Sequence, residues 1–234
     1  MPADPAPGLI IALDGLGSQE AADFSRRLSP DDCRLKVGSE LFVKGGPELV
    51  RDLQRQGFEI FLDLKFNDIP NTVAAACRAA REMGVWMCTV HASGGPTMLE
   101  AAREATQDEL HVVAVTVLTS LDDRDLDAVG QRSAEEQVVR LARLALQAGL
   151  SGIVCSAREA RQIRKECGSD FWVVTPGIRP AATADDQKRT VTPVEAAQAG
   201  ANHLVVGRPV VQADDPPAAV RSILKELSLA ADAA

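Results

Sequence analysis

Short apolar segments alternate with helical patterns along the whole of this 234-residue chain. Eight of the segments are bounded by Gly, Pro or polar residues and are largely apolar at successive positions, which is typical of strands buried on both faces of a parallel sheet. The expected strands are Leu9–Asp14, Cys33–Gly38, Phe58–Lys65, Val85–His91, His111–Leu118, Gly152–Cys155, Phe171–Pro176 and Asn202–Gly207.

Amphipathic helical patterns fill the intervals, and some carry start signals such as Pro47 at a first turn and Ser133 as an N-cap. We expect the Asp-rich stretch Asp122–Asp127 to be a solvated loop. The expected helices are Gln19–Leu28, Pro47–Gln56, Asn71–Met83, Thr97–Ala105, Ser133–Ala148, Ala157–Glu166, Pro193–Ala199 and Pro216–Leu227.

Eight strands alternating with eight helices indicate an α/β fold, a single-domain (β/α)8 TIM barrel. A doubly wound open sheet is the alternative, but the first strand ends in Asp14-Gly15-Leu16-Gly17, without the third glycine of a dinucleotide-binding turn. No Gly/Ser-rich or Pro-rich linker divides the chain. We therefore expect one domain over 1–234, with residues 1–8 as a flexible N-terminal extension.

Composition excludes several classes of protein. Apolar residues make up 46% of the chain and charged residues 25%, which fits a globular protein with a large core. The net charge of −8 and the lack of a Lys/Arg run argue against nucleic acid as a partner, and no apolar run is long enough to span a membrane. Five scattered cysteines predict reduced thiols in a cytoplasmic protein, without a disulfide framework or zinc site.

Polar residues interrupt the apolar runs where the expected strands end, which is where barrels gather functional groups. Strand side chains alternate, so Asp63 and Lys65 share one face. With Ile60, Leu62 and Leu64 turned outward, that face is the barrel interior. The polar residues at the strand ends are Asp14, Lys36, Asp63, Lys65, His91, Thr119, Ser120, Thr175, Arg179 and Arg208.

Asp63, Lys65 and Asp68, with Lys36 nearby, predict a network of alternating charges. Buried charges are costly unless they are paired, and the alternation supplies the partners. The two carboxylates would keep Lys65 protonated as a general acid. Such a site suits a reaction that loses a substrate carboxylate and protonates the resulting carbanion. The alternative is an ion-pair network that only braces a strand end.

The segment Asp63-Leu64-Lys65-Phe66-Asn67-Asp68-Ile69-Pro70-Asn71-Thr72 resembles the active-site segment of bacterial orotidine 5′-phosphate decarboxylases. Asn67 stands where many members have histidine, between the catalytic positions. The resemblance covers essentially the whole chain in an ordered series of further motifs, at Ile11–Asp14, Leu35–Phe42, Val117–Ser120, Val174–Pro180 and Val206–Pro209.

The resemblance implies cofactor-free decarboxylation of orotidine 5′-phosphate to uridine 5′-phosphate (UMP) in de novo pyrimidine biosynthesis, with no metal. Lys65 would donate the proton to C6 of the pyrimidine after carbon dioxide leaves. Asp63 would lie near the departing carboxylate, Lys36 would join the charge network and touch the ribose, and Asp14 would bind a ribose hydroxyl.

The resemblance also implies a homodimer with a shared active site. Asp68, Ile69 and Thr72 would reach into the site of the second subunit. The pyrimidine would be met by Thr119 and Ser120, with Pro176 packed beside the ring.

The loops after the last two strands are expected to bind the phosphate, as is common in barrels. Gly207 permits close backbone approach, and Arg208 offers a permanently charged, forked donor. The loop from Gly177 to Thr192 carries Arg179 and Gln187, and its length and polarity predict a lid that orders on phosphate.

Other readings remain open for parts of the chain. We expect His91 to have a packing role rather than a metal-binding one, and His111 and His203 to be structural, because they begin strands. The main alternative function is a magnesium-dependent sugar-phosphate decarboxylase or synthase of the same superfamily. A Schiff-base aldolase using Lys65 and a non-catalytic nucleotide-binding barrel are further alternatives.

Overall fold

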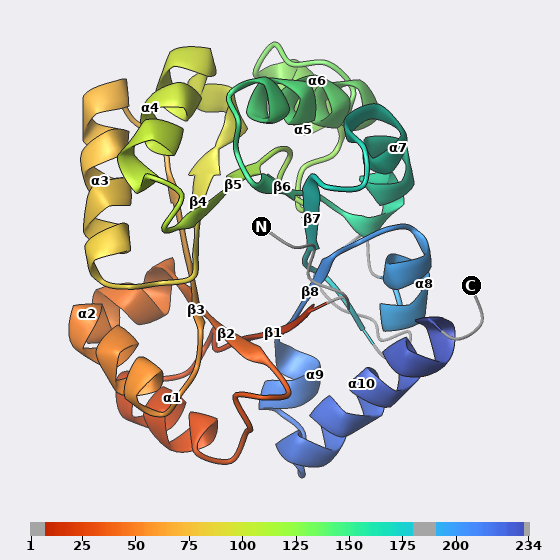
Figure 1. Cartoon of the computed structure of the whole chain (residues 1–234). Coiled ribbons are helices and arrows are strands. Elements are labelled where there is room, and N and C mark those ends of the chain that lie inside the picture. The colour runs from red at the N-terminus through yellow and green to blue at the C-terminus, as the bar shows by residue number, and fades with distance from the viewer. Residues whose placement is uncertain (1–7, 180–190, 232–234) are drawn as a thin grey trace.

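The strands close into one parallel barrel in the computed structural model, which describes residues 8–179 and 191–231. Each strand pairs with the next along the chain, and β8 pairs with β1. The expected (β/α)8 barrel is confirmed, with the strands at the centre of Figure 1. The strands are β1 Gly8–Ala12, β2 Arg34–Gly38, β3 Ile60–Phe66, β4 Met87–His91, β5 His111–Val115, β6 Gly152–Val154, β7 Trp172–Thr175 and β8 His203–Val206.

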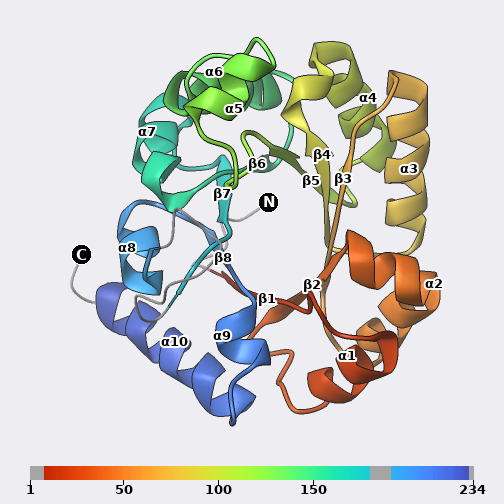
Figure 2. The same ribbon diagram turned by 180° about the vertical axis from the view of Figure 1, so that it is seen from behind.

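Helices form a ring outside the strands, which is seen from both ends of the barrel in Figures 1 and 2. All eight expected helices are present, and within the described residues three short additional ones lie after β4, β5 and β8. The helices are α1 Ser18–Ser25, α2 Ser39–Arg55, α3 Pro70–Glu82, η1 Ala92–Gly94, α4 Pro96–Thr106, α5 Asp123–Ala128, α6 Ala134–Gln147, α7 Ala157–Cys167, α8 Pro193–Gln198, α9 Arg208–Val211 and α10 Pro216–Ala231.

The expectation of a solvated loop at Asp122–Asp127 is wrong, because most of this stretch forms α5. The Asp122 carboxylate accepts hydrogen bonds from the backbone N–H groups of Arg124 and Asp125, at 3.0 and 3.2 Å. The Asp125 carboxylate accepts one in return from the Asp122 N–H. This reciprocal cap, together with the burial of Leu126, stabilises a helix where acidity alone suggested only solvation.

The helix expected from Pro47 begins earlier, at Ser39. Gly46 interrupts it with a backbone φ of 56°, a left-handed conformation that glycine adopts without steric cost. Pro47 follows this kink and starts the second section of α2, as the sequence predicted for a first turn. The earlier section begins directly after β2, at Ser39.

Alternation along the strands divides the core into two layers. One face of each strand packs against the helices, with Ile60 and Leu62 fully buried there as expected. The other face points into the barrel interior, beneath the cavity end. Burial of each large apolar side chain there stabilises the folded state by about 1.5–3 kcal/mol. The inner cluster consists of Ile10, Ala12, Phe61, Met87, Val113, Val174 and Val205.

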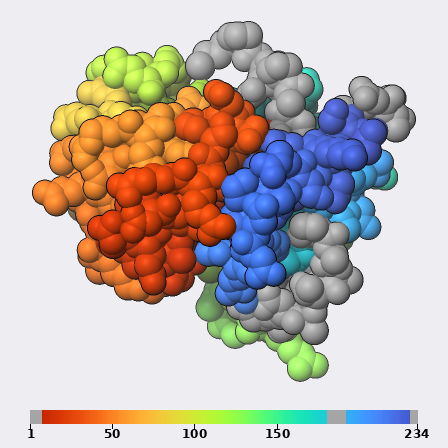
Figure 3. Space-filling model, turned by 90° about the horizontal axis from the view of Figure 1, so that it is seen from below, coloured from red at the N-terminus to blue at the C-terminus, as the bar shows by residue number. Residues whose placement is uncertain are grey.

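The first and last parts of the described chain are neighbours in the barrel, because β1 pairs with β8. Gly8 belongs to β1, so the expected flexible extension is wrong at this residue, and residues 1–7 lie outside the described residues. The red and blue segments lie side by side in Figure 3. Between these parts of the chain, the Arg27 guanidinium donates to the Asp214 carbonyl at 3.4 Å. In the part of the chain described, no helix combines the length and apolarity needed to cross a membrane.

Candidate active site

A cavity of about 630 Å³ opens at the carboxyl ends of the strands, above the inner apolar cluster. Residues from seven of the eight strand ends line it. The structure thus brings together most of the side chains that the sequence predicted for one site. Those that line the cavity are Asp14, Lys36, Asp63, Lys65, Thr119, Pro176, Arg179, Gly207 and Arg208.

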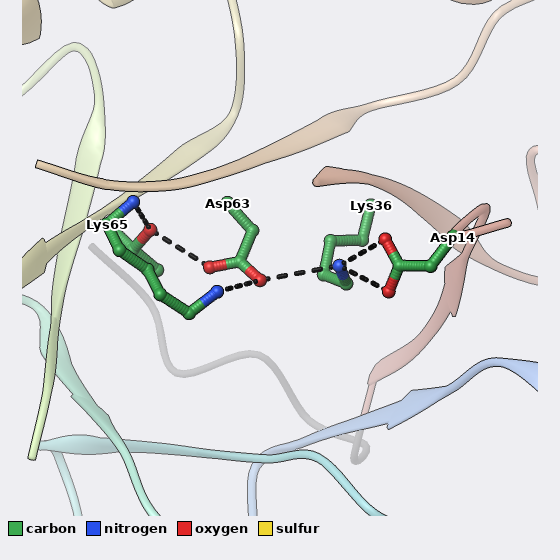
Figure 4. Close-up of polar contacts among 5 residues, drawn as sticks. Asp14, Lys36, Asp63 and Lys65 are labelled. Atoms are coloured by element: carbon green, nitrogen blue, oxygen red, sulfur yellow. Dashed lines mark hydrogen bonds and ion pairs between the residues drawn. The ribbon is translucent and has the colours of Figure 1, made fainter. Parts of the chain in front are cut away.

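Four of these residues form a row of alternating charges, Asp14–Lys36–Asp63–Lys65 (Figure 4). The Lys36 ammonium lies 2.9 Å from Asp14 Oδ2 and 3.3 Å from Asp63 Oδ2. Lys65 Nζ donates to the same Asp63 oxygen at 2.8 Å. The predicted alternation is therefore present, with Asp14 rather than Asp68 as the second carboxylate of this chain.

Burial is greatest in the middle of the row. The side chains of Lys36 and Asp63 are 8% and 12% exposed, whereas those of Lys65 and Asp14 are 35% and 57% exposed. The cavity therefore presents a partly open ammonium group at one end and a solvated carboxylate at the other.

Neighbouring groups stabilise the ionised form of Asp63. Burial alone would raise the pKa of this carboxyl, but the charges of Lys36 and Lys65 and hydrogen bonds from Lys65 and Thr89 hold the pKa below its ordinary value. Asp63 is therefore ionised at neutral pH and fixes the ammonium group of Lys65.

The backbone of β3 departs from regular geometry between its two catalytic candidates. Its pairing with β4 shifts between Leu62 and Phe66, which marks a bulge. Lys65 has a φ of 54°, in the left-handed region that residues other than glycine rarely adopt. Asp63 and Lys65 meet inside the barrel as predicted, but through this irregular turn rather than through strict strand alternation.

Gly38 at the end of β2 leaves the space that the network occupies. A Cβ atom at this position would lie 2.5 Å from Asp14 Oδ1 and 3.1 Å from Lys36 Nζ. Any larger residue would therefore displace Asp14 from Lys36, so close packing accounts for glycine here.

Two arginines bring positive charge to the part of the cavity that follows β7 and β8. Arg179 follows β7 and is buried, with Nη1 donating to the Ile178 carbonyl at 3.0 Å. Arg208 follows Gly207 and begins α9 directly after β8. The cavity thus combines a charge row near β2 and β3 with guanidinium groups near β7 and β8.

Other predicted residues lie apart from this cavity. Asp68 and Thr72 are exposed, and Ile69 is exposed over 65% of its surface, all three at the start of α3. Asp68 Oδ1 accepts a hydrogen bond from the neighbouring Ile69 N–H. Ser120 is exposed beside Thr119 and does not line the cavity. Gln187 and most of the expected lid lie outside the described residues.

Sequence reasoning missed the apolar wall of the site and one buried hydroxyl, that of Thr89 on β4. Alternation on the short strands was the signal that could have identified the wall. Its members are Ala12, Phe61, Val115, Val117, Leu118, Val154, Cys155 and Val205.

His91 and metal binding are the other chemical possibilities at this end of the barrel. Burial and the nearby charge of Lys65 lower the pKa of His91, so its ring is neutral at pH 7. No group of three or more His, Cys, Asp or Glu residues that could hold a metal ion occurs among residues 8–179 and 191–231.

Comparisons with known proteins agree with the geometry. The model of the orotidine 5′-phosphate decarboxylase / HUMPS family matches residues 7–223. The orotidine 5′-phosphate decarboxylase of Hydrogenovibrio crunogenus is 55% identical over 224 residues, covering 94% of this chain and 95% of that protein. The decarboxylase of Chromohalobacter salexigens is 56% identical over 225 residues, covering 94% and 95%.

A solved structure supports the same assignment. The crystal structure of orotidine 5′-phosphate decarboxylase from Lactobacillus acidophilus is similar with a TM-score of 0.85 and 37% identity, covering 94% of this chain and 99% of that one. The names of these relatives agree with the expected class of enzyme, a carboxy-lyase. The resemblance expected from the motifs is confirmed, and the chain belongs to the orotidine 5′-phosphate decarboxylase / HUMPS family.

Proposed function

We propose that this protein converts orotidine 5′-phosphate to UMP and carbon dioxide without a metal or organic cofactor. The observation that carries the proposal is the charge row Asp14–Lys36–Asp63–Lys65, which lies in the same cavity as Arg179 and Arg208. The row supplies a fixed ammonium group next to a buried carboxylate, and the arginines supply a site for an anion.

Asp63 and Lys65 would each have a separate role in the reaction. The bond between C6 and the substrate carboxylate breaks, its electron pair stays on C6, and carbon dioxide leaves. Lys65 then gives a proton from Nζ to C6 and regains one from water. A general acid in place beside the carbanion lowers the barrier to this step.

Asp63 would place a negative charge beside the carboxylate that leaves. Phosphate binding at a distance would hold the substrate against this repulsion, and the repulsion would fall as carbon dioxide departs. Because Asp63 is already held between two lysines, its charge is fixed before the substrate enters.

The dimensions and polarity of the cavity suit a nucleotide. Asp14 and Lys36 would hold the ribose, and Arg179, Gln187, Gly207 and Arg208 would hold the phosphate. The pyrimidine would lie over the apolar wall, between Lys65 and a group formed by Thr119, Ser120 and Pro176.

The direct experiment follows the conversion of orotidine 5′-phosphate by its ultraviolet absorbance and identifies UMP by mass spectrometry. Turnover should persist at an unchanged rate after treatment with EDTA. A strict requirement for added Mg²⁺, together with turnover of a sugar phosphate, would instead favour the magnesium-dependent alternative.

We also propose a homodimer in which Asp68, Ile69 and Thr72 complete the site of the partner subunit. Exposure supports this proposal, since Ile69 is a large apolar side chain on the surface and Asp68 lies outside the charge row of its own chain. The resemblance to the family supports the proposal that these residues serve the partner's site rather than their own.

Mixing two inactive variants tests the shared site. Asp68→Ala and Lys65→Ala subunits combined in equal amounts should regain about a quarter of wild-type activity, because about half of the dimers are mixed and each has one complete site of two. Mixed dimers that form but stay inactive would contradict it.

We place the enzyme in the cytoplasm. The five cysteines support this proposal because all are unpaired and four are buried, as expected for thiols in a reducing compartment. Fractionation of the producing cells tests it.

A further inference from the structure

We infer that Thr89 is a positioning residue for the decarboxylation, because its single hydroxyl group holds both the Asp63 carboxylate and the backbone of Lys65. The inference rests on the proposed function, in which these two residues act on the substrate. Thr89 lies on β4 and is fully buried, and it does not line the cavity. Its effect on the reaction is therefore exerted through its two neighbours.

The two hydrogen bonds of Thr89 run in opposite senses. Its Oγ1 donates to Asp63 Oδ1 at 3.0 Å and accepts from the Lys65 backbone N–H at 2.8 Å. A hydroxyl is one of the few side-chain groups that can do both at a single atom.

The bulge in β3 accounts for the need for this hydroxyl. Leu62 pairs with Cys88, and the next pair is Phe66 with Val90, so β3 passes four residues where β4 passes two. A bulge leaves backbone groups without partners in the sheet, and a buried N–H without a partner is costly. Thr89 faces the bulge and supplies the missing acceptor to Lys65.

Thr89 also gives the two oxygen atoms of Asp63 different partners. Oδ2 receives Lys65 Nζ at 2.8 Å and lies 3.3 Å from Lys36 Nζ, whereas Oδ1 receives the hydroxyl of Thr89. The carboxylate plane is thereby set, with one oxygen toward the lysines. Without this hydrogen bond the carboxylate could rotate, and the direction of the Lys65 ammonium would change with it.

The test compares Thr89→Val, which keeps the shape but loses the hydroxyl, with Thr89→Ser, which keeps the hydroxyl. Removing hydrogen bonds to a charged group and to a buried N–H should lower kcat for orotidine 5′-phosphate by about 10- to 100-fold. KM should stay within about threefold, because the groups proposed to bind substrate remain. Thr89→Ser should retain kcat within a few-fold of wild type.

The pH profile separates positioning from a merely structural role. The hydrogen bond from Thr89 helps to hold down the pKa of Asp63, so its loss should move the acidic limb of log kcat to higher pH in Thr89→Val and leave it in place in Thr89→Ser. A folded Thr89→Val enzyme with wild-type kcat and an unmoved acidic limb would overturn the inference.

Thr106→Val is the matched control. Thr106 is also buried, but it lies on the outer helix α4, where its hydroxyl donates to the Arg103 carbonyl at 2.8 Å, and it does not line the cavity. This variant should keep wild-type kcat and pH profile. Equal losses in Thr106→Val and Thr89→Val would show a general effect of such substitutions and overturn the inference.

Two further results keep the test decisive. If Thr89→Val does not fold, Thr89→Cys replaces it, since a thiol is only a weak donor and acceptor; kcat equal to that of Thr89→Ser would then overturn the inference. If the wild-type protein does not decarboxylate orotidine 5′-phosphate, the proposed function fails instead, and the hydrogen bonds of Thr89 have no bearing on that outcome.

Discussion

The two ends of the barrel carry different kinds of side chains. At the carboxyl ends of the strands, charged side chains pair with one another around an open cavity. At the amino ends, aromatic and imidazole rings pack together instead. This second group, the N-terminal ring cluster, consists of Trp86, His111, Trp172 and His203, with Arg34 over one ring.

Ring contacts predominate within the N-terminal ring cluster, and His111 Nδ1 also lies 3.3 Å from Ser151 Oγ. The ring centroids of His111 and Trp172 lie 4.3 Å apart, and those of Trp172 and His203 lie 4.8 Å apart. The Arg34 guanidinium lies 4.1 Å from the Trp86 ring centroid, a cation–π geometry. His203 is fully buried, and neither of its ring nitrogens has a hydrogen-bond partner among the described residues.

This difference separates function from stability within one sheet. The sheet carries charged side chains toward the carboxyl ends of several strands, and rings at or just before the starts of β4, β5, β7 and β8. A substitution at one end should therefore leave the property of the other unchanged. Substitutions at each end of the barrel test that separation.

The largest effect should follow Lys65→Ala. Losing the proposed proton donor should lower kcat/KM for orotidine 5′-phosphate by about 10³-fold or more, the upper range for general acid catalysis. The fold should persist, because Asp63 keeps its ion pair with Lys36. Steady-state kinetics and thermal unfolding measure the two properties, and Lys165→Ala on the outer helix α7 is the matched control. Activity within tenfold of wild type would contradict the assigned role.

Arg208→Ala should weaken recognition of the phosphate. We expect kcat/KM for orotidine 5′-phosphate to fall by about 100-fold, as for loss of a charged hydrogen-bonded pair, while turnover of orotidine without its phosphate changes little. The exposed Arg221→Ala on α10 serves as the control. Equal losses on both substrates would show that Arg208 acts on the chemical step or on the fold instead.

At the other end of the barrel, Trp172→Ala should lower stability and spare catalysis. Removing this indole from its contacts should reduce the free energy of unfolding by about 3 kcal/mol, measured with a chemical denaturant. The kcat/KM of the remaining folded enzyme should stay within twofold of wild type. A loss of activity larger than this would show that the two ends are coupled.

His203 should make the N-terminal ring cluster sensitive to acid. Burial, with repulsion from Arg34, His111 and Arg164, lowers the pKa of His203 to about 3. The unfolded chain has a pKa of about 6.5 for this group, so the stability it contributes is present above pH 6.5 and is lost as the pH falls toward 3. At pH 5 the loss should be about 2 kcal/mol.

The variant His203→Leu isolates this effect, because leucine fills a similar space and does not titrate. The decrease in unfolding free energy between pH 7.5 and pH 5 should shrink by about 2 kcal/mol relative to wild type. An unchanged decrease would assign the acid sensitivity to other groups.

The fold could be predicted because its signal is periodic. The alternation of eight apolar segments with helical patterns can be recognised even when a boundary is wrong by a few residues, as the end of β5 at Val115 rather than Leu118 shows. The helix α5 could not be predicted from acidity, since its stability comes from the reciprocal cap of Asp122 and Asp125 and from one buried leucine. Those contacts depend on backbone geometry, which composition does not reveal.

The site could be predicted where it follows strand ends, and not where it follows an irregular backbone. Asp14 follows β1, Lys36 lies within β2 and Asp63 lies at the start of the irregular part of β3, and the cavity brings them together as expected. Thr89 was missed because its role arises from a register shift between β3 and β4. Asp68 is the remaining case, since one chain alone does not contain the neighbour that it is proposed to serve.

We propose that an ammonium group at position 65, held by Asp63, performs the chemistry at the carboxyl end of the barrel. Lys65→Cys followed by alkylation with 2-bromoethylamine tests this role, because the product restores an amine of nearly the same length. The other cysteines are controlled by treating the wild-type enzyme in parallel, four of the five being buried. We predict an inactive variant whose kcat recovers by about 100-fold or more on alkylation. Full alkylation of Cys at position 65 by mass spectrometry, with no recovery in a folded protein, would contradict the account.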